Sequence, residues 1–232
     1  MSYLWQEFNI KTFPSETLVF RDGVFYKELS DYENVIFDAK NNTININKTP
    51  KLPIHIIYIG EIAGNIDINI DLNAVNTNVF MTTKINNKKP AFLNFFIKNA
   101  GKNSVFNGKI IVQNYDSLKV DVKAEHLCEN TGIFVKTRVM AHKNTNTVLN
   151  GCANIGKNTQ YCDSDISFSV MADKSAKIKM MPTQYIKSEP NVATHSASLY
   201  KPKENQIEYL RGAGLSGIEI KNILREAFLE QN

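Results

Sequence analysis

The segment NIDINIDL, residues 65–72, restricts the possible folds of this chain more than any other feature. Polar and apolar residues alternate in it without a break, which is the two-residue period of a half-buried β-strand. Its buried face would consist of Ile66, Ile68, Ile70 and Leu72. Similar short segments follow one another from Thr17 to about Ile186, and no helical period of useful length interrupts them. The chain is therefore predicted to be mainly β.

The other predicted strands are TLVF, IHIIYI, NVFMTTKI, FLNFFI, GKIIV, LKVDVKA, IFVKTRVM and DISFSVM. Asparagine, glycine, aspartate and lysine turns separate them. A series of this kind suits a sandwich, a barrel or a solenoid. We favour a solenoid because asparagine and small residues recur at strand ends, as in NAGKNSVFNGKII and NTNTVLNGCANIGKNTQ. The tight corners of a solenoid need residues that tolerate unusual backbone angles.

The C-terminal end of the chain has a different pattern. KENQIEYLRGAG predicts a short helix that ends at glycine, and LSGIEIKNILREAFLEQN predicts a second helix. Ser216 and Glu219 have the spacing of a capping box, in which serine accepts from the N3 amide and glutamate reaches back. One face of the second helix would carry Ile220, Ile223, Leu224, Ala227 and Phe228. The hairpin thus has an apolar side to bury against the sheet or a partner.

Composition sets the broad class of the protein. A length of 232 residues and a hydrophobic content of 43% indicate one large domain or a domain with a small appendage. We divide it into an N-terminal lead-in (1–16), a β-helix core (17–200) and a C-terminal helical segment (201–232). The net charge of +4 is too small and too dispersed to indicate binding to nucleic acid or a membrane.

Three features predict a cytoplasmic location. Cys128, Cys152 and Cys162 are an odd number at wide spacings, which argues against a secreted disulfide framework. The start MSYLWQEFNIKTF has no signal-peptide pattern. The longest apolar run, PIHIIYIG, is far too short to span a bilayer.

The segment GAGLSG, residues 212–217, matches the glycine pattern of dinucleotide-binding loops. That chemistry needs a preceding strand and an acidic residue about twenty positions further on. Here a helical pattern precedes the glycines and the sequence ends at Asn232, so we interpret the segment as the connection between two helices.

Candidate chemical residues are few. His126 and Cys128 are two soft ligands, but no second pair stands at a zinc-site distance, and no GxSxG nucleophile motif occurs. Cys162 has two interpretations, a thiolate that carries iron or sulfur and a buried small hydrophobe. His195, in NVATHSAS, is either a ligand or catalyst, or a turn histidine bonded to the backbone.

Much of the chain, most strongly its C-terminal end, resembles the SufB/SufD family, the scaffold proteins of the SUF iron–sulfur cluster assembly system. The blocks VMADKSAKIKMMPTQYI, NVATHSAS, IEYLRGAGLS and EIKNILREAFL follow one another in the order found in that family. TLVFRDGVFYKELSD resembles the start of the family core. AHKNTNT, which contains His142, and GKNSVFNGKIIV are similar to segments inside that core.

The resemblance implies a right-handed parallel β-helix with C-terminal helices. Members of the family pair through their β-helices, as SufB with SufD or as homodimers, and clusters are thought to form where the two chains meet. His195 stands where the SufD histidine belongs, and TQYCDS resembles a SufB block that would make Cys162 a sulfur acceptor. Thr194 and Ser196 stand where SufB has glutamates, which favours a short SufD-like member.

The expected role is that of a scaffold and not of an enzyme. The resemblance implies that the C-terminal helices dock on a SufC-like ABC-type ATPase, and ATPase activity is expected in that partner. No GxxxxGK[ST] motif occurs in this chain. Iron or an iron–sulfur cluster would be held only transiently, with His195 as an iron ligand. Candidate ATPase-binding residues lie in the tail, and they are Tyr209, Leu210, Leu215, Ile220, Leu224 and Phe228.

Two other functions are compatible with a β-solenoid. One is a protein-interaction module without metal or cluster chemistry, which suits Ala193, where SufD-like chains often have a cysteine. The other is an enzyme that acts on polysaccharides, which would need clustered carboxylates on one exposed face. Acidic residues such as Asp67 and Asp71 are instead scattered over several strands.

Overall fold

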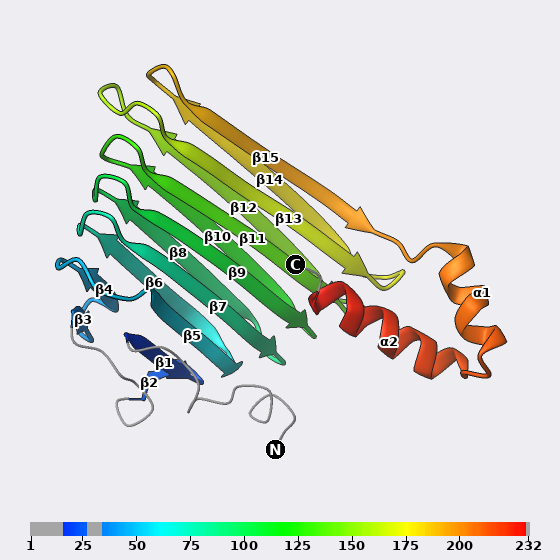
Figure 1. The fold of residues 1–232 in the computed structure, drawn as a ribbon. Coiled ribbons are helices and arrows are strands. Elements are labelled where there is room, and N and C mark those ends of the chain that lie inside the picture. The colour runs from blue at the N-terminus through cyan, green and yellow to red at the C-terminus, as the bar shows by residue number, and fades with distance from the viewer. Residues whose placement is uncertain (1–15, 27–33, 231–232) are drawn as a thin grey trace.

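The computed structural model describes residues 16–26 and 34–230, so nearly all of the predicted lead-in lies outside the described residues. Strands account for 58% of the structure. They form two sheets, of eight and seven strands, and consecutive strands from β5 onward alternate between the two sheets (Figure 1).

Sheet A contains, in spatial order, β2 (Val24–Phe25), β1 (Thr17–Arg21), β5 (Ile54–Glu61), β7 (Asn78–Asn87), β9 (Val105–Asn114), β11 (Gly132–Ala141), β13 (Asp163–Ala172) and β15 (Val192–Tyr200). Sheet B contains β3 (Val35–Asp38), β4 (Thr43–Ile46), β6 (Gly64–Leu72), β8 (Ala91–Asn99), β10 (Ser117–His126), β12 (Asn146–Ile155) and β14 (Lys177–Ile186). The pairs β1–β2 and β3–β4 are antiparallel, and the other pairs are parallel.

The register shows that the chain returns to the same place once per coil. Val105 is the register partner of both Asn78 and Gly132. Residues at equivalent positions of these coils, such as Asn76 and Asn103, are 27 apart, and the separation between Thr131 and Cys162 is 31. The described chain therefore forms a β-solenoid of about six turns, which confirms the predicted fold class.

The core lies between the two sheets. Ile68, Ile70 and Leu72 are buried and Ile66 is half-buried, so the alternation predicted for residues 65–72 is confirmed. The segment at 146–155 was expected to supply corner residues, but it is strand β12. Its Gly151 faces inward, where an added Cβ would lie 2.7 Å from Ile166 Cγ2. Glycine is therefore a core residue there.

Asparagines form the tight corners, as expected from their recurrence at strand ends. Asn76, Asn103 and Asn130 have φ angles of 51°, 58° and 52°, in the left-handed region that asparagine tolerates. In the next coil the same corner position is occupied by Tyr161, with φ of 57°. Its amide donates to Pro190 O, as that of Asn130 donates to Gln160 O.

The tail forms the two predicted helices, α1 (Glu204–Gly212) and α2 (Gly217–Glu230). The capping box is confirmed, because the amide of Glu219 donates to Ser216 Oγ at 3.4 Å and that of Ser216 donates to Glu219 Oε2 at 2.8 Å. Gly214, at φ of 85°, forms the connection between the helices. The interpretation of the glycines as a helix connection is thus confirmed.

Helix α2 lies on the outer face of sheet A (Figure 1). Its buried residues are Ile220, Leu224, Phe228 and Leu229. They pack against Ile111, Met140 and Met171 of β9, β11 and β13. The predicted face is thus confirmed at Ile220, Leu224 and Phe228. Ile223 is 40% exposed and Ala227 is also exposed, so the prediction was wrong at these two positions.

Tyr161→Asn should stabilise the fold. A left-handed backbone strains tyrosine more than asparagine, and the Tyr161 side chain is 63% exposed, so few contacts are lost. We expect the free energy of unfolding in urea to rise by about 0.5–1 kcal/mol. Tyr185→Asn, at an exposed tyrosine in strand β14, is the matched control and should give no gain. A loss of stability in the Tyr161 variant would contradict this explanation.

Candidate functional site

The C-terminal end of the solenoid is open. Strands β14 and β15 are the last strands of their sheets, and each pairs with one neighbour in the part of the chain that the structure describes. Their outer edges therefore present unpaired backbone N–H and C=O groups, a ready surface for pairing with another chain. Figure 1 shows both strands side by side at this end of the stack.

His195 lies in the middle of β15 and not in a turn. Its register partner is Ile166, whose own partner on the other side is Val135. Register partners in parallel strands point to the same face, and both Ile166 and Val135 are buried in the core. His195 thus continues an interior row at the point where no further described coil covers it, and its side chain is exposed.

Apolar side chains gather on the same two strands and beside them. Those with more than a third of their surface exposed are Met181, Tyr185, Ile186, Val192 and Leu199. The predicted β-helix core (17–200) includes β15, but no strand was predicted there, because VATHSASLY is rich in small polar residues and lacks a clear alternation. The signal that could have revealed this end is that the apolar residues of β14 and β15 have no later strand to cover them.

Cys162 is buried at the corner before β13, with 1% of its surface exposed. Its Sγ lies 3.3 Å from Thr131 Oγ1 and 3.4 Å from the carbonyl oxygen of Cys128. Thr131 occupies the same corner position in the preceding coil, and Ser104 occupies it in the coil before that. The carbonyl of Ser104 accepts from the amide of Gly132, and the carbonyl of Thr131 accepts from the amide of Asp163. The thiol therefore occupies a place that hydroxyl groups fill elsewhere in the column.

The structure does not bring Cys162 and His195 together within one chain. The amide of Cys162 donates to Asn191 Oδ1 at 2.8 Å, and its carbonyl accepts from Val192, so it lies level with Asn191. His195 is four residues further along an extended strand, which corresponds to about 13 Å. A site that used both groups would need a large movement or a second chain.

His126 ends β10 in the same corner and is 1% exposed. Its Nδ1 lies 2.8 Å from Thr131 Oγ1, and the Thr131 hydroxyl donates to the carbonyl of Cys128. The proton of the neutral imidazole is therefore on Nδ1, which donates to Thr131. Burial lowers the pKa of His126 to about 4, so the ring is neutral at physiological pH.

The predicted pair of soft ligands does not extend into a metal site. The Thr131 hydroxyl joins the His126 ring to the backbone carbonyl of Cys128 and not to its thiol. Within residues 16–26 and 34–230, no group of three or more His, Cys, Asp or Glu side chains is arranged to hold a metal ion.

The candidate ATPase-binding residues fall into two groups. Tyr209 of α1 is 77% exposed, whereas Leu210 and Leu215 are half-buried. Ile220, Leu224 and Phe228 are buried in the contact between α2 and sheet A. Sequence reasoning missed Ile218, which is also 77% exposed, because it was not on the apolar face of the predicted helix.

Charged and aromatic contacts hold α2 in place. Asp173, the residue after β13, accepts from Arg225 Nη2 at 3.0 Å and pairs with Lys221 Nζ at 2.8 Å. These cations lower the pKa of Asp173 against the opposing effect of its partial burial. Phe228 stacks on Tyr200 of β15 at 5.1 Å. The helix is therefore joined to the last strand of sheet A.

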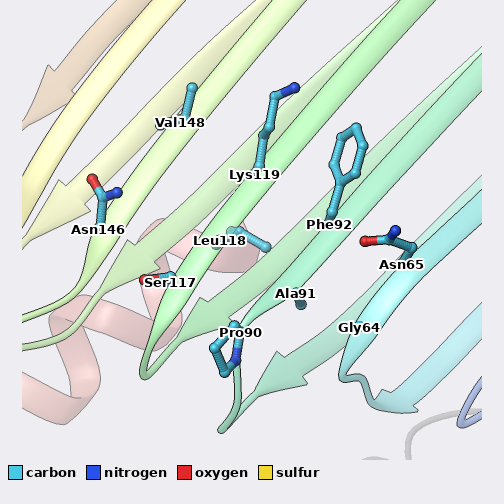
Figure 2. A pocket seen from close by; sticks show the side chains of 10 residues that line it. All are labelled: Gly64, Asn65, Pro90, Ala91, Phe92, Ser117, Leu118, Lys119, Asn146 and Val148. Atoms are coloured by element: carbon cyan, nitrogen blue, oxygen red, sulfur yellow. The ribbon is translucent and has the colours of Figure 1, made fainter.

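The outer face of sheet B has a shallow hollow of about 410 Å³, shown in Figure 2. The side chains of Asn65, Phe92, Lys119 and Val148 project from four adjacent strands along it. The ammonium of Lys119 lies 4.4 Å from the centre of the Phe92 ring and pairs with Asp121 at 2.9 Å. Lys119 is the charged residue among those that line the hollow, and it is already paired. Among the described residues, no helix combines the length and apolarity needed to cross a membrane.

Comparison with known families assigns most of this architecture. A family model described as "SUF system FeS cluster assembly, SufBD core domain" matches residues 63–228, which is more than half of the chain. The match begins just before β6 and ends within α2, so it includes Cys162, His195 and the helix connection. No curated protein matches the chain.

Replacing His126 with asparagine should remove a pH dependence of stability. The folded pKa of about 4 lies below the ordinary value of 6.5, so the unfolded chain binds more protons between these values. The contribution of His126 to the free energy of unfolding is therefore fully present above pH 6.5 and is lost as the pH falls towards 4. Urea unfolding should show the native chain losing about 2 kcal/mol more than His126→Asn between about pH 7 and pH 5.

Asparagine is a suitable replacement because Asn99 occupies the register position of His126 in the preceding coil. Equal losses in the native chain and the variant would show that His126 is not held neutral in the folded state.

Proposed function

The chain belongs to the SufB/SufD core family of the SUF iron–sulfur cluster assembly system, and we propose that it works as a scaffold through the open end of its solenoid. Members of this family are assembly components and generally not enzymes themselves. The observation that carries the proposal is the exposure of His195 in an interior row, on an edge strand that no further described coil covers.

Pairing with a second β-solenoid is the first part of the proposal. A SufB-like chain or a second copy of this chain would add strands to the edges of β14 and β15, which satisfies their unpaired backbone groups. The exposed Ile186 and Leu199 continue interior rows through Ile155 and Val170, and they would become buried in the same step. Two chains joined in this way would enclose His195 at their junction.

His195 would then serve as a ligand for iron that is being assembled. A neutral imidazole nitrogen is a borderline-soft ligand that suits ferrous iron, and thiolates complete such sites. In this proposal the thiolate at the junction comes from the partner chain, because Cys162 lies about 13 Å away along the strand. A role for Cys162 as a sulfur acceptor would require its corner to open, since the thiol is buried. The cluster is cargo and leaves the scaffold.

The tail helices are the proposed contact for a SufC-like ABC-type ATPase, in which ATP hydrolysis would occur. The exposed apolar residues Tyr209, Ile218 and Ile223 are available for such a contact. Leu224 and Phe228, which we also considered as contact residues, anchor α2 on sheet A. Their role in docking would be to hold the exposed residues in position, and movement of α2 would act on β15 through the Tyr200–Phe228 contact.

His195→Ala should impair cluster assembly without disturbing the complex. The side chain is exposed, so we expect the variant to fold and to co-purify with its partner chain and the ATPase. Activity of an iron–sulfur enzyme should fall in cells that depend on this protein for cluster assembly. Ser196→Ala, at the next exposed residue of β15, is the matched control and should behave as the native chain.

Full assembly activity with His195→Ala would overturn the role of His195 and favour an interaction module without metal chemistry. Failure of the variant to co-purify would show that His195 acts in pairing and not as an iron ligand.

A further inference from the structure

A cluster of four basic residues lies on the outer face of sheet A, away from the open end. We call Lys84, Lys109, Lys136 and Arg138 the basic patch. Lys109 of β9 and Lys136 of β11 are register partners, so their side chains leave the same face of adjacent strands about 4.8 Å apart. Arg138 is two residues further along β11, and Lys84 is on β7 beside Ile111.

The basic patch is electrostatically crowded. Lys109 is half-buried, and its pKa is lowered by burial first and then by Arg138, Lys84 and Lys136, while Glu230 acts in the opposite direction. In the part of the chain that the structure describes, Lys109 and Lys136 form no ion pair. Like charges at register positions repel one another, so the folded chain keeps an arrangement that an anion would stabilise.

One carboxylate of the chain already shows how an acidic group sits at the edge of this patch. Glu230, the last residue of α2, pairs with Lys84 at 2.9 Å. The Lys84 side chain is only 13% exposed, so this pair is partly shielded from water. The patch therefore accepts a protein carboxylate at one corner, and Lys109 and Lys136 offer the same chemistry beside it.

The spacing of the cations suits an extended acidic segment. Lys136 and Arg138 are alternate residues of one strand, about 6.6 Å apart, which is also the distance between alternate side chains of an extended peptide. We propose that the basic patch binds an extended acidic segment of a partner protein, with carboxylates at alternate positions. This contact is separate from the open end and from the exposed residues of α1, and it would orient a partner on the face that α2 also occupies.

Single-stranded nucleic acid is the main rival, because His55 stacks on the exposed Phe80 nearby on the same face. The number of charges argues against it. Affinity for a phosphate backbone grows with the number of phosphates neutralised, and here Lys84 is already paired.

The test uses the full chain and a fluorescein-labelled short peptide with glutamate at alternate positions and threonine between them. Fluorescence anisotropy should show binding that weakens as sodium chloride is raised. The double variant Lys109→Gln/Lys136→Gln should weaken it by about three- to tenfold. The control Lys123→Gln/Lys179→Gln removes the same charge from the outer face of sheet B and should leave binding unchanged.

Three results would overturn the proposal. They are no salt-sensitive binding of the peptide, an equal loss in the control pair, and tighter binding of a short single-stranded oligonucleotide that depends on the same two lysines. Circular dichroism of all variants would show that each is folded.

Discussion

The register of parallel strands is the constraint on which the rest of this structure depends. Each coil places its side chains directly over those of the coil before, so interior rows such as Val135–Ile166 run along the whole stack. A row of this kind has to end, and at its end a side chain is aligned with the core but left uncovered. His195 is that side chain in the last coil. The fold thus creates an exposed, interior-facing histidine on an unpaired edge without any special local motif.

The same stacking explains the corners. Asparagine recurs where the backbone must be left-handed, and threonine, serine or cysteine recurs where a corner needs a buried group that bonds to the backbone. Cys162 belongs to the second of these columns, and His126 lies beside that column with its ring bonded to Thr131, which accounts for the burial of both. Outside the solenoid, α2 crosses three strands of sheet A, and ion pairs at Asp173 and Glu230 hold it near both of its ends.

The sequence predicted the elements whose pattern is local. The alternation at residues 65–72, the asparagine corners and the capping box at Ser216 each depend on neighbours in the chain, and all three were found. The contacts that depend on the register between coils could not be predicted from the sequence. The coil length changes from 27 to 31 residues, so sequence alone could not place His195 over Ile166 or Cys162 beside Thr131. The buried face of α2 was predicted only in part for a related reason, because the surface of sheet A and not helical periodicity alone decides which side of the helix is covered.

The central claim is that the uncovered end of the solenoid is where this chain joins another. Hydrogen–deuterium exchange measured by mass spectrometry, on the isolated chain and on the complex purified from cells, tests it most directly. The account predicts that amides of Lys177–Ile186 and Val192–Tyr200 are slowed in the complex, because their edge groups become paired, while the interior strands β9 and β10 change little. Unchanged exchange at both edge strands in a stable complex would contradict it.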